Sequence, residues 1–293
     1  MIEWRAGLNG FREHKLDGSN FTTILYENDF EENRNLDAIF LDHLKDLNGP
    51  LELLYSGGAD SELILAFCVR NKIPVEAITM VIKARGAILN VVDLYYSEKF
   101  CRENNVKHRI VELNALEFYE SGKYLEYLLP FNIIEPHVAS HFWLIEQCYN
   151  FPVIGGDWPW VQAHKEKKIL SPYKLAFSSY ERFMNNKGIV GIGNMISHSY
   201  ESCYYFMRKH IENYEPGNDK FHTVPFLKYK MYGFEEPRIK SYGWERTPVE
   251  LFNINRYKIE LIKKLGTPNA IIKWGQRTKQ LLGADTFENS TFI

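Results

Sequence analysis

The chain has 293 residues, of which 45% are hydrophobic and 25% charged, a composition typical of a soluble globular protein with one large domain or a core with an appendage. A formal net charge of −2 gives no global positive field, which argues against a nucleic-acid partner. The absence of an apolar run of about 18 residues, and of a basic start followed by an apolar stretch, argues against a membrane partner and a secretory signal.

The cysteines favour a reduced, cytoplasmic protein over a disulfide-stabilised or zinc-binding scaffold, because they are far apart and form no Cys-x-x-Cys pair. They are Cys68, Cys101, Cys148 and Cys203.

The first segment, residues 1–34, shows few clear periods and is expected to be an N-terminal extension with a short strand at 24–26. Residues 36–45 then carry apolar side chains at helical spacing. Asn35 is the expected N-cap of this helix, and Asn48-Gly49-Pro50 is expected to end it.

From residue 51 onward, apolar strand-like and helix-like segments alternate. Strands are predicted at 51–55, 75–82, 107–113 and 151–154, and helices at 62–71, 89–105 and 136–149. This order predicts an α/β fold, a parallel sheet with helices on both faces. Ligands of such sheets bind at the carboxyl ends of strands, so the loop at 56–61 and the turn at 155–157 are expected to lie at one site.

The pattern changes after about residue 175, where helices are predicted at 180–185, 195–213 and 255–265. We therefore expect a nucleotide-binding α/β domain at 35–175 and a mostly helical, substrate-specifying region at 176–293. The glycine-rich segment 188–194 is expected to be a mobile loop, with a lid over the site as the alternative.

The loop Ser56-Gly57-Gly58-Ala59-Asp60-Ser61 joins a predicted strand to a predicted helix. Its glycines let the backbone approach a phosphate, the amides of the helix start face that phosphate, and the two serines add hydroxyl donors. Asp60 would repel phosphate unless Mg²⁺ bridges the two. A Walker A loop needs a Lys-Ser/Thr pair and a dinucleotide loop needs Gly-x-Gly-x-x-Gly, and neither is present.

This loop resembles the Ser-Gly-Gly-x-Asp-Ser signature of the PP-loop ATP pyrophosphatases, members of the adenine nucleotide alpha hydrolase superfamily. The family includes asparagine synthetases, NAD synthetases, GMP synthetases and tRNA-modifying enzymes, and the resemblance covers about residues 36–160. It implies that ATP is split into AMP and pyrophosphate, with adenylation of a substrate that a nitrogen or sulfur nucleophile then attacks.

The resemblance also implies roles for individual residues. The residues expected to hold the pyrophosphate part of ATP are Ser56, Gly57, Gly58, Ala59, Asp60 and Ser61. Backbone groups near Val81 and Ile82 would meet the adenine. Independently of the resemblance, Lys83 and Arg85 are candidates for reaching the nucleotide, because they follow the second strand.

Asp157, in Gly155-Gly156-Asp157 after the fourth strand, is the expected second metal ligand beside Asp60. In asparagine synthetases a Gly-x-Gly-Ala-Asp-Glu segment occupies a similar place, and its Asp helps to bind Mg²⁺. Here Trp158-Pro159-Trp160 follows instead, so a simple turn is the alternative. Lys165 is the candidate for neutralising phosphate charge during transfer, against the alternative of a solvated charged surface.

The synthetase domain of asparagine synthetase is the nearest resemblance, but the glutaminase cysteine at position 2 is replaced by Ile2. The chain is therefore expected to use ammonia, an amine or an amidotransferase partner. Three functions stay open: an amide-forming ligase, a nucleobase-modifying enzyme, and a nucleotide-binding module without catalysis. His137 and His141, four residues apart on a predicted helix, could ligate a metal, contact substrate or belong to ordinary helix surface.

Overall fold

The computed structural model describes the chain in several stretches. Backbone and side chains are described at 34–156, 179–196, 198–199, 201–202, 205–206, 209, 232–233 and 251–265, and backbone alone at 3–6, 11–15, 22–26, 160–164, 167–171 and 176–178. Asp157 and Lys165, both predicted site residues, lie outside these ranges. No helix in the described stretches is both long and apolar enough to cross a membrane.

The elements follow one another along the chain as follows. They are β1 (Glu3–Ala6), β2 (Phe11–Lys15), β3 (Thr22–Tyr26), α1 (Leu36–Leu44), β4 (Leu51–Leu54), α2 (Ala59–Arg70), β5 (Val75–Ala84), β6 (Ala87–Ile88), α3 (Val91–Glu103), β7 (Lys107–Asn114), α4 (Ala115–Glu120), α5 (Lys123–Leu128), a 3₁₀ turn at Leu129–Phe131, α6 (His137–Ile145), β8 (Phe151–Ile154), β9 (Trp160–His164), β10 (Lys167–Ser171), α7 (Ala176–Lys187) and α10 (Asn255–Lys264).

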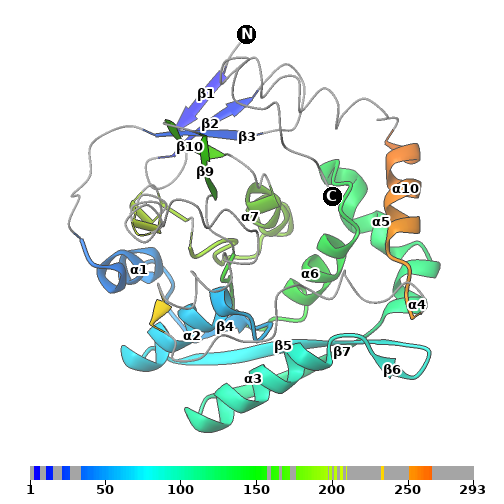
Figure 1. Cartoon of the computed structure of the whole chain (residues 1–293), viewed down its shortest axis with the longest axis horizontal. Helices are drawn as coiled ribbons and strands as arrows, with labels where there is room; N and C mark the ends of the chain where they lie inside the picture. The colour runs from blue at the N-terminus through cyan, green and yellow to red at the C-terminus, as the bar shows by residue number, and fades with distance from the viewer. Residues whose placement is uncertain are drawn as a thin grey trace.

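Four strands of the five-stranded main sheet are parallel and lie in the order β7-β5-β4-β8 (Figure 1), and the short β6 pairs with the end of β5 in the antiparallel sense. Leu51 of β4 is level with Val75 of β5 on one side and with Phe151 of β8 on the other. The chain therefore runs outward from β4 through β5 to β7 and then returns to the opposite side of β4. Such a reversal creates a switch point in the sheet, where ligands of open α/β folds bind.

Helices cover both faces of this sheet, as the sequence predicts. The side chains of β4 alternate, so that Leu51 and Leu53 join one buried cluster while Leu54 joins the other. The first cluster packs against α1 and α2, and the second against α4, α5, α6, α7 and α10. Figure 1 shows α3 and α6 on opposite sides of β5 and β7.

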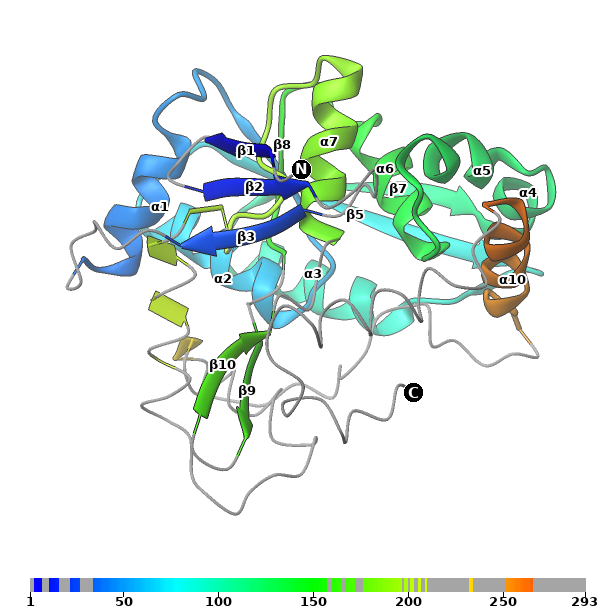
Figure 2. The ribbon, with the colours of Figure 1, turned by 90° about the horizontal axis from the view of Figure 1, so that it is seen from above.

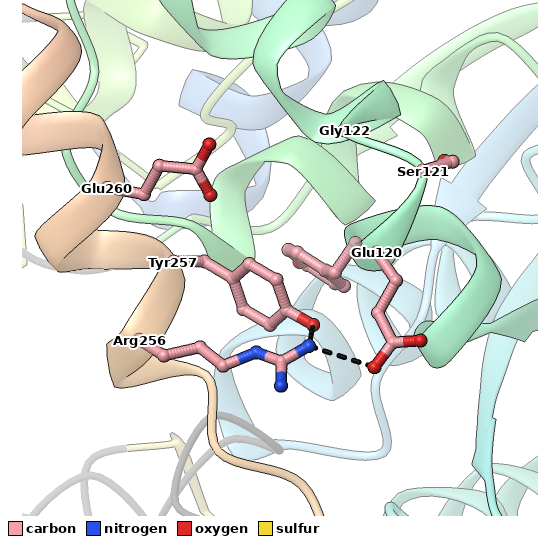
Figure 3. Close-up of a pocket in the computed structure, with 7 residues that line it drawn as sticks. Glu120, Ser121, Gly122, Arg256, Tyr257 and Glu260 are labelled. Atoms are coloured by element: carbon pink, nitrogen blue, oxygen red, sulfur yellow. Dashed lines mark hydrogen bonds and ion pairs between the residues drawn. The ribbon is translucent and has the colours of Figure 1, made fainter.

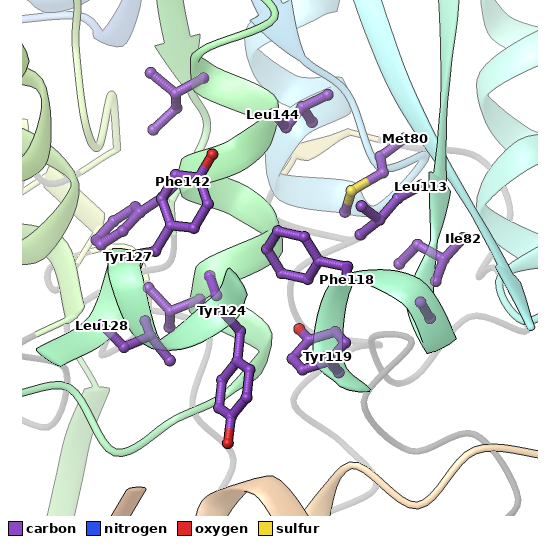
Figure 4. Packing of buried hydrophobic residues seen from close by; sticks show 14 of the residues in the cluster. Met80, Ile82, Leu113, Phe118, Tyr119, Tyr124, Tyr127, Leu128, Phe142 and Leu144 are labelled. Carbon is purple, nitrogen blue, oxygen red and sulfur yellow. The ribbon is translucent and has the colours of Figure 1, made fainter. Parts of the chain in front are cut away.

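The second cluster is rich in aromatic rings (Figure 4). Phe142 of α6 stacks on Phe183 of α7 with ring centroids 4.3 Å apart, and Tyr119 of α4 lies 5.0 Å from Tyr257 of α10. Residues beyond the predicted boundary at 175 thus pack directly on the sheet's own helices.

The view from above (Figure 2) separates the antiparallel sheet β1–β3 from the β9–β10 hairpin.

The glycine-rich segment 188–194 differs from the expected loop. Ile192 donates its backbone N–H to Pro152 and accepts from Ile154, so the segment runs beside β8 as an added edge. Gly191 is required there, because a Cβ would lie 2.4 Å from the Pro152 carbonyl oxygen. Ile192 and Asn194 are each 2% exposed, so this segment is part of the packed sheet edge.

The predicted helix at 36–45 is confirmed, including its N-cap. The Asn35 side chain accepts from the backbone N–H of Ala38 at 2.8 Å. At the other end of α1, the buried His43 shares a hydrogen bond of 2.8 Å with the Ser199 hydroxyl, and its ring lies 4.9 Å from that of His198. These contacts attach residues 198 and 199 to α1.

His43 should make the stability of the protein depend on pH. Burial, aided by the charge of nearby His198, lowers the pKa of His43 to about 3. In the unfolded state His43 would bind a proton near pH 6.5, whereas in the folded state it would bind one only near pH 3. The free energy of unfolding should therefore fall as the pH drops from about 6.5 to about 3. We expect urea denaturation to show a loss of about 2 kcal/mol between pH 7 and pH 5 that is missing in His43→Gln. An equal loss in the variant would contradict this assignment.

Candidate functional site

The glycine loop lies at the switch point, between the end of β4 and the start of α2. The backbone N–H of Tyr55, just after β4, donates to the Ile78 carbonyl of β5 at 2.8 Å. Gly57 then adopts a φ of +65°, and Gly58 is the N-cap of α2 in extended conformation. The helix begins at Ala59, three residues before the predicted start, so Asp60 and Ser61 belong to its first turn.

Two glycines allow elements to approach the loop closely. A Cβ on Gly57 would lie 2.6 Å from the Asp93 carbonyl oxygen, so α3 packs directly on the loop. A Cβ on Gly155, just after β8, would lie 2.9 Å from the Cα of Ser61. The turn after β8 therefore touches the first turn of α2, as predicted. Asp157 itself is outside the described residues, so its role as a metal ligand stays a prediction.

The start of α2 fits the anionic tail of a nucleotide. Aligned peptide dipoles give a helix N-terminus a partial positive charge and outward-facing amides. Gly58 has no side chain to cap those amides, and a Cβ on Gly155 would fall 3.1 Å from the Ser61 nitrogen. The exposed Ser56 hydroxyl lies 3.4 Å from that of Ser61, which donates to the Gly58 carbonyl.

The two acidic residues in the first turn of α2 differ in their surroundings. Glu62 is 3% exposed and accepts from the Tyr55 hydroxyl at 2.5 Å, so it is part of the packing behind the loop. Asp60 is half-buried and accepts from the hydroxyl of Tyr232 at 2.6 Å. A carboxylate beside a helix start that suits a phosphate is itself a suitable ligand for Mg²⁺, so the chemistry of Asp60 fits the role predicted for it.

The edge of β5 beyond the end of β4 is occupied by a side chain. The Asn90 amide donates to the Met80 carbonyl at 2.7 Å and accepts from the Ile82 N–H at 2.9 Å. The Ile82 carbonyl accepts from Leu89. Because backbone groups alternate along a strand, those of Val81 point toward β7. The adenine contact expected at Val81 and Ile82 stays a prediction, and through Ile82 it would require Asn90 to move.

The remaining candidate residues lie further away or have other partners. Lys83 forms an exposed ion pair of 2.5 Å with Glu112, roughly 16 Å along β5 from the level of the loop. His141 shares a hydrogen bond of 2.6 Å with the Tyr180 hydroxyl, and its ring is 5.8 Å from that of His137. Among the described residues no group of three or more His, Cys, Asp or Glu side chains could hold a metal.

A separate pocket of about 460 Å³ lies between the α4–α5 turn and α10 (Figure 3). The Arg256 guanidinium forms an ion pair with Glu120 at 2.9 Å and lies over the Tyr257 ring. Glu260 accepts from the Tyr124 hydroxyl at 2.7 Å. None of the residues that line this pocket belongs to the glycine loop or to the turn after β8.

Two residues at this site carry no signal in the sequence that would mark them. Tyr232 lies in a stretch that shows no recognisable motif, 172 residues from Asp60. Asn90 precedes α3 and has the residue type of an N-cap, yet its side chain makes no cap and bonds to β5. Tyr232 and Asn90 both reach the site through tertiary contacts, which sequence spacing does not encode.

No protein-family model matches the sequence, and a search of curated proteins gives no significant match. Similar solved structures include three of 12–13% identity. An NH₃-dependent NAD synthetase from Campylobacter jejuni has 13% identity and a TM-score of 0.31, with 70% of this chain and 96% of that one covered. An NMN synthetase from Francisella tularensis has 12% identity and a TM-score of 0.32, with 71% and 97% covered.

The third is a U34-tRNA thiolase from Methanococcus maripaludis with a [4Fe-4S] cluster, at 12% identity and a TM-score of 0.33, with 78% of this chain and 77% of that one covered. At these TM-scores the likeness says nothing about which reaction this chain catalyses. Its function has to be argued from the site.

Proposed function

We propose that this protein is an ATP pyrophosphatase that adenylates a carboxylate or carbonyl substrate for attack by ammonia or an amine. The observation that carries the proposal is the start of α2, where amides without a side-chain cap and the Asp60 carboxylate meet at the switch point of the sheet. A simple glycine turn would not need this combination. The Asp60 carboxylate would repel an anion that arrives by itself. It suits an anion that arrives with Mg²⁺, because the cation can bind both.

The chain's own groups would bind and orient the triphosphate. The amides of Gly58, Ala59 and Ser61 would face the β- and γ-phosphates, and the Ser56 hydroxyl would donate to them. Asp60, with Asp157 as the proposed second ligand, would hold Mg²⁺, whose charge offsets the negative charge that develops on the leaving pyrophosphate. Lys165 is proposed to add positive charge on the same side.

The reaction follows in two balanced steps. An oxygen of the substrate attacks the α-phosphorus, the bond from that phosphorus to the α–β bridging oxygen breaks, and pyrophosphate leaves. The nitrogen nucleophile then attacks the activated carbon, AMP leaves with the transferred oxygen, and the nitrogen loses a proton to water. The loop would accelerate the first step by holding the leaving group in line, because positioning supplies much of the catalysis in phosphoryl-type transfers.

The test is the product pattern from ATP. With Mg²⁺, a panel of carboxylates and ammonia, the wild type should form AMP and pyrophosphate in equal amounts. Asp60→Ala should lower that rate about 100-fold or more, since it removes a group that acts on the transition state. Glu117→Ala, which changes an exposed acid in the first turn of α4, is the control and should keep full activity.

Other outcomes separate the competing functions. Formation of ADP and phosphate would overturn the proposal. Calorimetric binding of ATP without AMP release on any acceptor, RNA included, would indicate a nucleotide-binding module. AMP release that depends on RNA would favour a nucleobase-modifying enzyme, and mass spectrometry of a trapped adenylate would identify the acceptor.

A further inference from the structure

We propose that Tyr232 is a positioning residue that orients the Asp60 carboxylate toward the Mg²⁺ of the bound nucleotide. The inference rests on the proposed function. Its basis is the hydrogen bond of 2.6 Å from the Tyr232 hydroxyl to Oδ1 of Asp60, which joins positions 172 residues apart. Such a short bond from a hydroxyl to a carboxylate is charge-assisted and about twice as strong as a neutral one.

The Tyr232 ring is itself held by the core behind the loop. It meets the Phe206 ring edge-on, with centroids 6.1 Å apart, and Phe206 is 1% exposed. Phe206 lies 6.4 Å from Phe40 of α1, and Phe40 meets Phe67 at 5.3 Å and 78°. Phe67 belongs to α2, the helix that carries Asp60.

These contacts form a closed path from Asp60 through Tyr232, Phe206, Phe40 and Phe67 back to α2. The Tyr232 side chain is held by Phe206 at its ring and by Asp60 at its hydroxyl, so it has little freedom to rotate. The hydroxyl therefore fixes one oxygen of the carboxylate, and with it the direction in which the carboxylate meets a cation. In metal sites, hydrogen bonds of this kind to a ligating carboxylate typically change metal affinity 10- to 100-fold.

The competing explanation is purely structural. In that case the bond attaches the C-terminal region to α2, and its loss lowers stability without affecting the metal. Tyr124 offers a matched comparison, because its hydroxyl donates to Glu260 at 2.7 Å in the pocket beside α10, away from the loop. Tyr124→Phe removes the same kind of bond without touching Asp60.

The experiment measures binding of α,β-methylene ATP by calorimetry at a series of Mg²⁺ concentrations, together with thermal melts. Tyr232→Phe should raise the Mg²⁺ concentration needed for half-maximal binding about tenfold, whatever the loss of the bond does to the Tm. Tyr124→Phe should leave that concentration unchanged. In an Asp60→Asn background, Tyr232→Phe should have no further effect, because the two residues act on the same metal.

An unchanged Mg²⁺ requirement in Tyr232→Phe, with or without a lower Tm, would overturn the inference while leaving the proposed function intact. A shift of equal size in Tyr124→Phe would overturn it as well. If the wild type shows no Mg²⁺-dependent binding of the analogue, the proposed function and this inference fail together.

Discussion

Replacing Gly57 with alanine should reduce the formation of AMP and pyrophosphate about 100-fold and destabilise the protein by about 2–4 kcal/mol. Two effects add at this position. The φ of +65° strains any residue with a Cβ, and that Cβ would lie 2.6 Å from the Asp93 carbonyl oxygen at the start of α3. The loop must shift to relieve the contact. A displacement of about 1 Å in a site that works by positioning is enough to cause a loss of this size.

Gly188 provides a control for the backbone strain alone. Its φ is +67°, and a Cβ there would meet nothing within 4 Å. Gly188→Ala should therefore cost about 1–2 kcal/mol and leave the rate unchanged. Urea denaturation and product formation of both variants, compared side by side, isolate the contact with α3. A Gly57→Ala protein with the rate and stability of Gly188→Ala would show that the loop tolerates displacement.

The sheet and its helices could be predicted because their signals are local. Apolar runs of strand length alternate with segments of helical spacing, and the N-cap at Asn35 follows from a short-range rule. The short helices α4 and α5 were not predicted. Their packing depends on a distant helix, since Tyr124 of α5 donates to Glu260 of α10. A short helix that is stabilised by such contacts leaves no period in its own sequence.

The site could be predicted only in part, for a related reason. The glycine loop is a continuous motif, so the sequence alone is enough to predict a role for Asp60 and Ser61. The meeting of Gly155 with α2 followed from the rule for strand ends. The contacts of Tyr232 and Asn90 depend on how remote segments fold back, and no spacing encodes them. For the segment at 188–194, glycines suggest a loop, whereas here Gly191 permits close packing against Pro152.

The buried carboxylate of Glu52 joins β4 both to β7, through an ion pair, and to the segment that enters β8. Glu52, the second residue of β4, is 0% exposed, and one of its oxygens accepts from Arg109 of β7 at 2.8 Å. Its other oxygen accepts from the backbone N–H groups of Tyr149 and Asn150, at 2.5 Å and 2.8 Å, just before β8. Arg109 also donates to the Gln147 carbonyl at 3.0 Å. The carboxylate thus fixes where β8 enters the sheet beside β4.

Removing the positive partner should therefore be costly. Arg109→Met would leave a charged carboxylate buried without a counter-ion, which typically costs about 3–5 kcal/mol and would lower the Tm by roughly 10 °C. Lys83→Met, which breaks the exposed pair with Glu112, should cost about 1 kcal/mol or less.

The double variant Glu52→Gln/Arg109→Met distinguishes an unpaired charge from lost packing. A glutamine at position 52 keeps an acceptor for Tyr149 and Asn150 but carries no charge, so most of the stability lost in Arg109→Met should return. Urea denaturation of the three variants measures this directly. If the double variant is as unstable as Arg109→Met, the cost comes instead from the Arg109 side chain itself, through its contacts with Gln147 and the Tyr149 ring. In either case β8, and with it the turn at Gly155 that touches α2, depends on an interaction at the opposite end of β4 from the glycine loop.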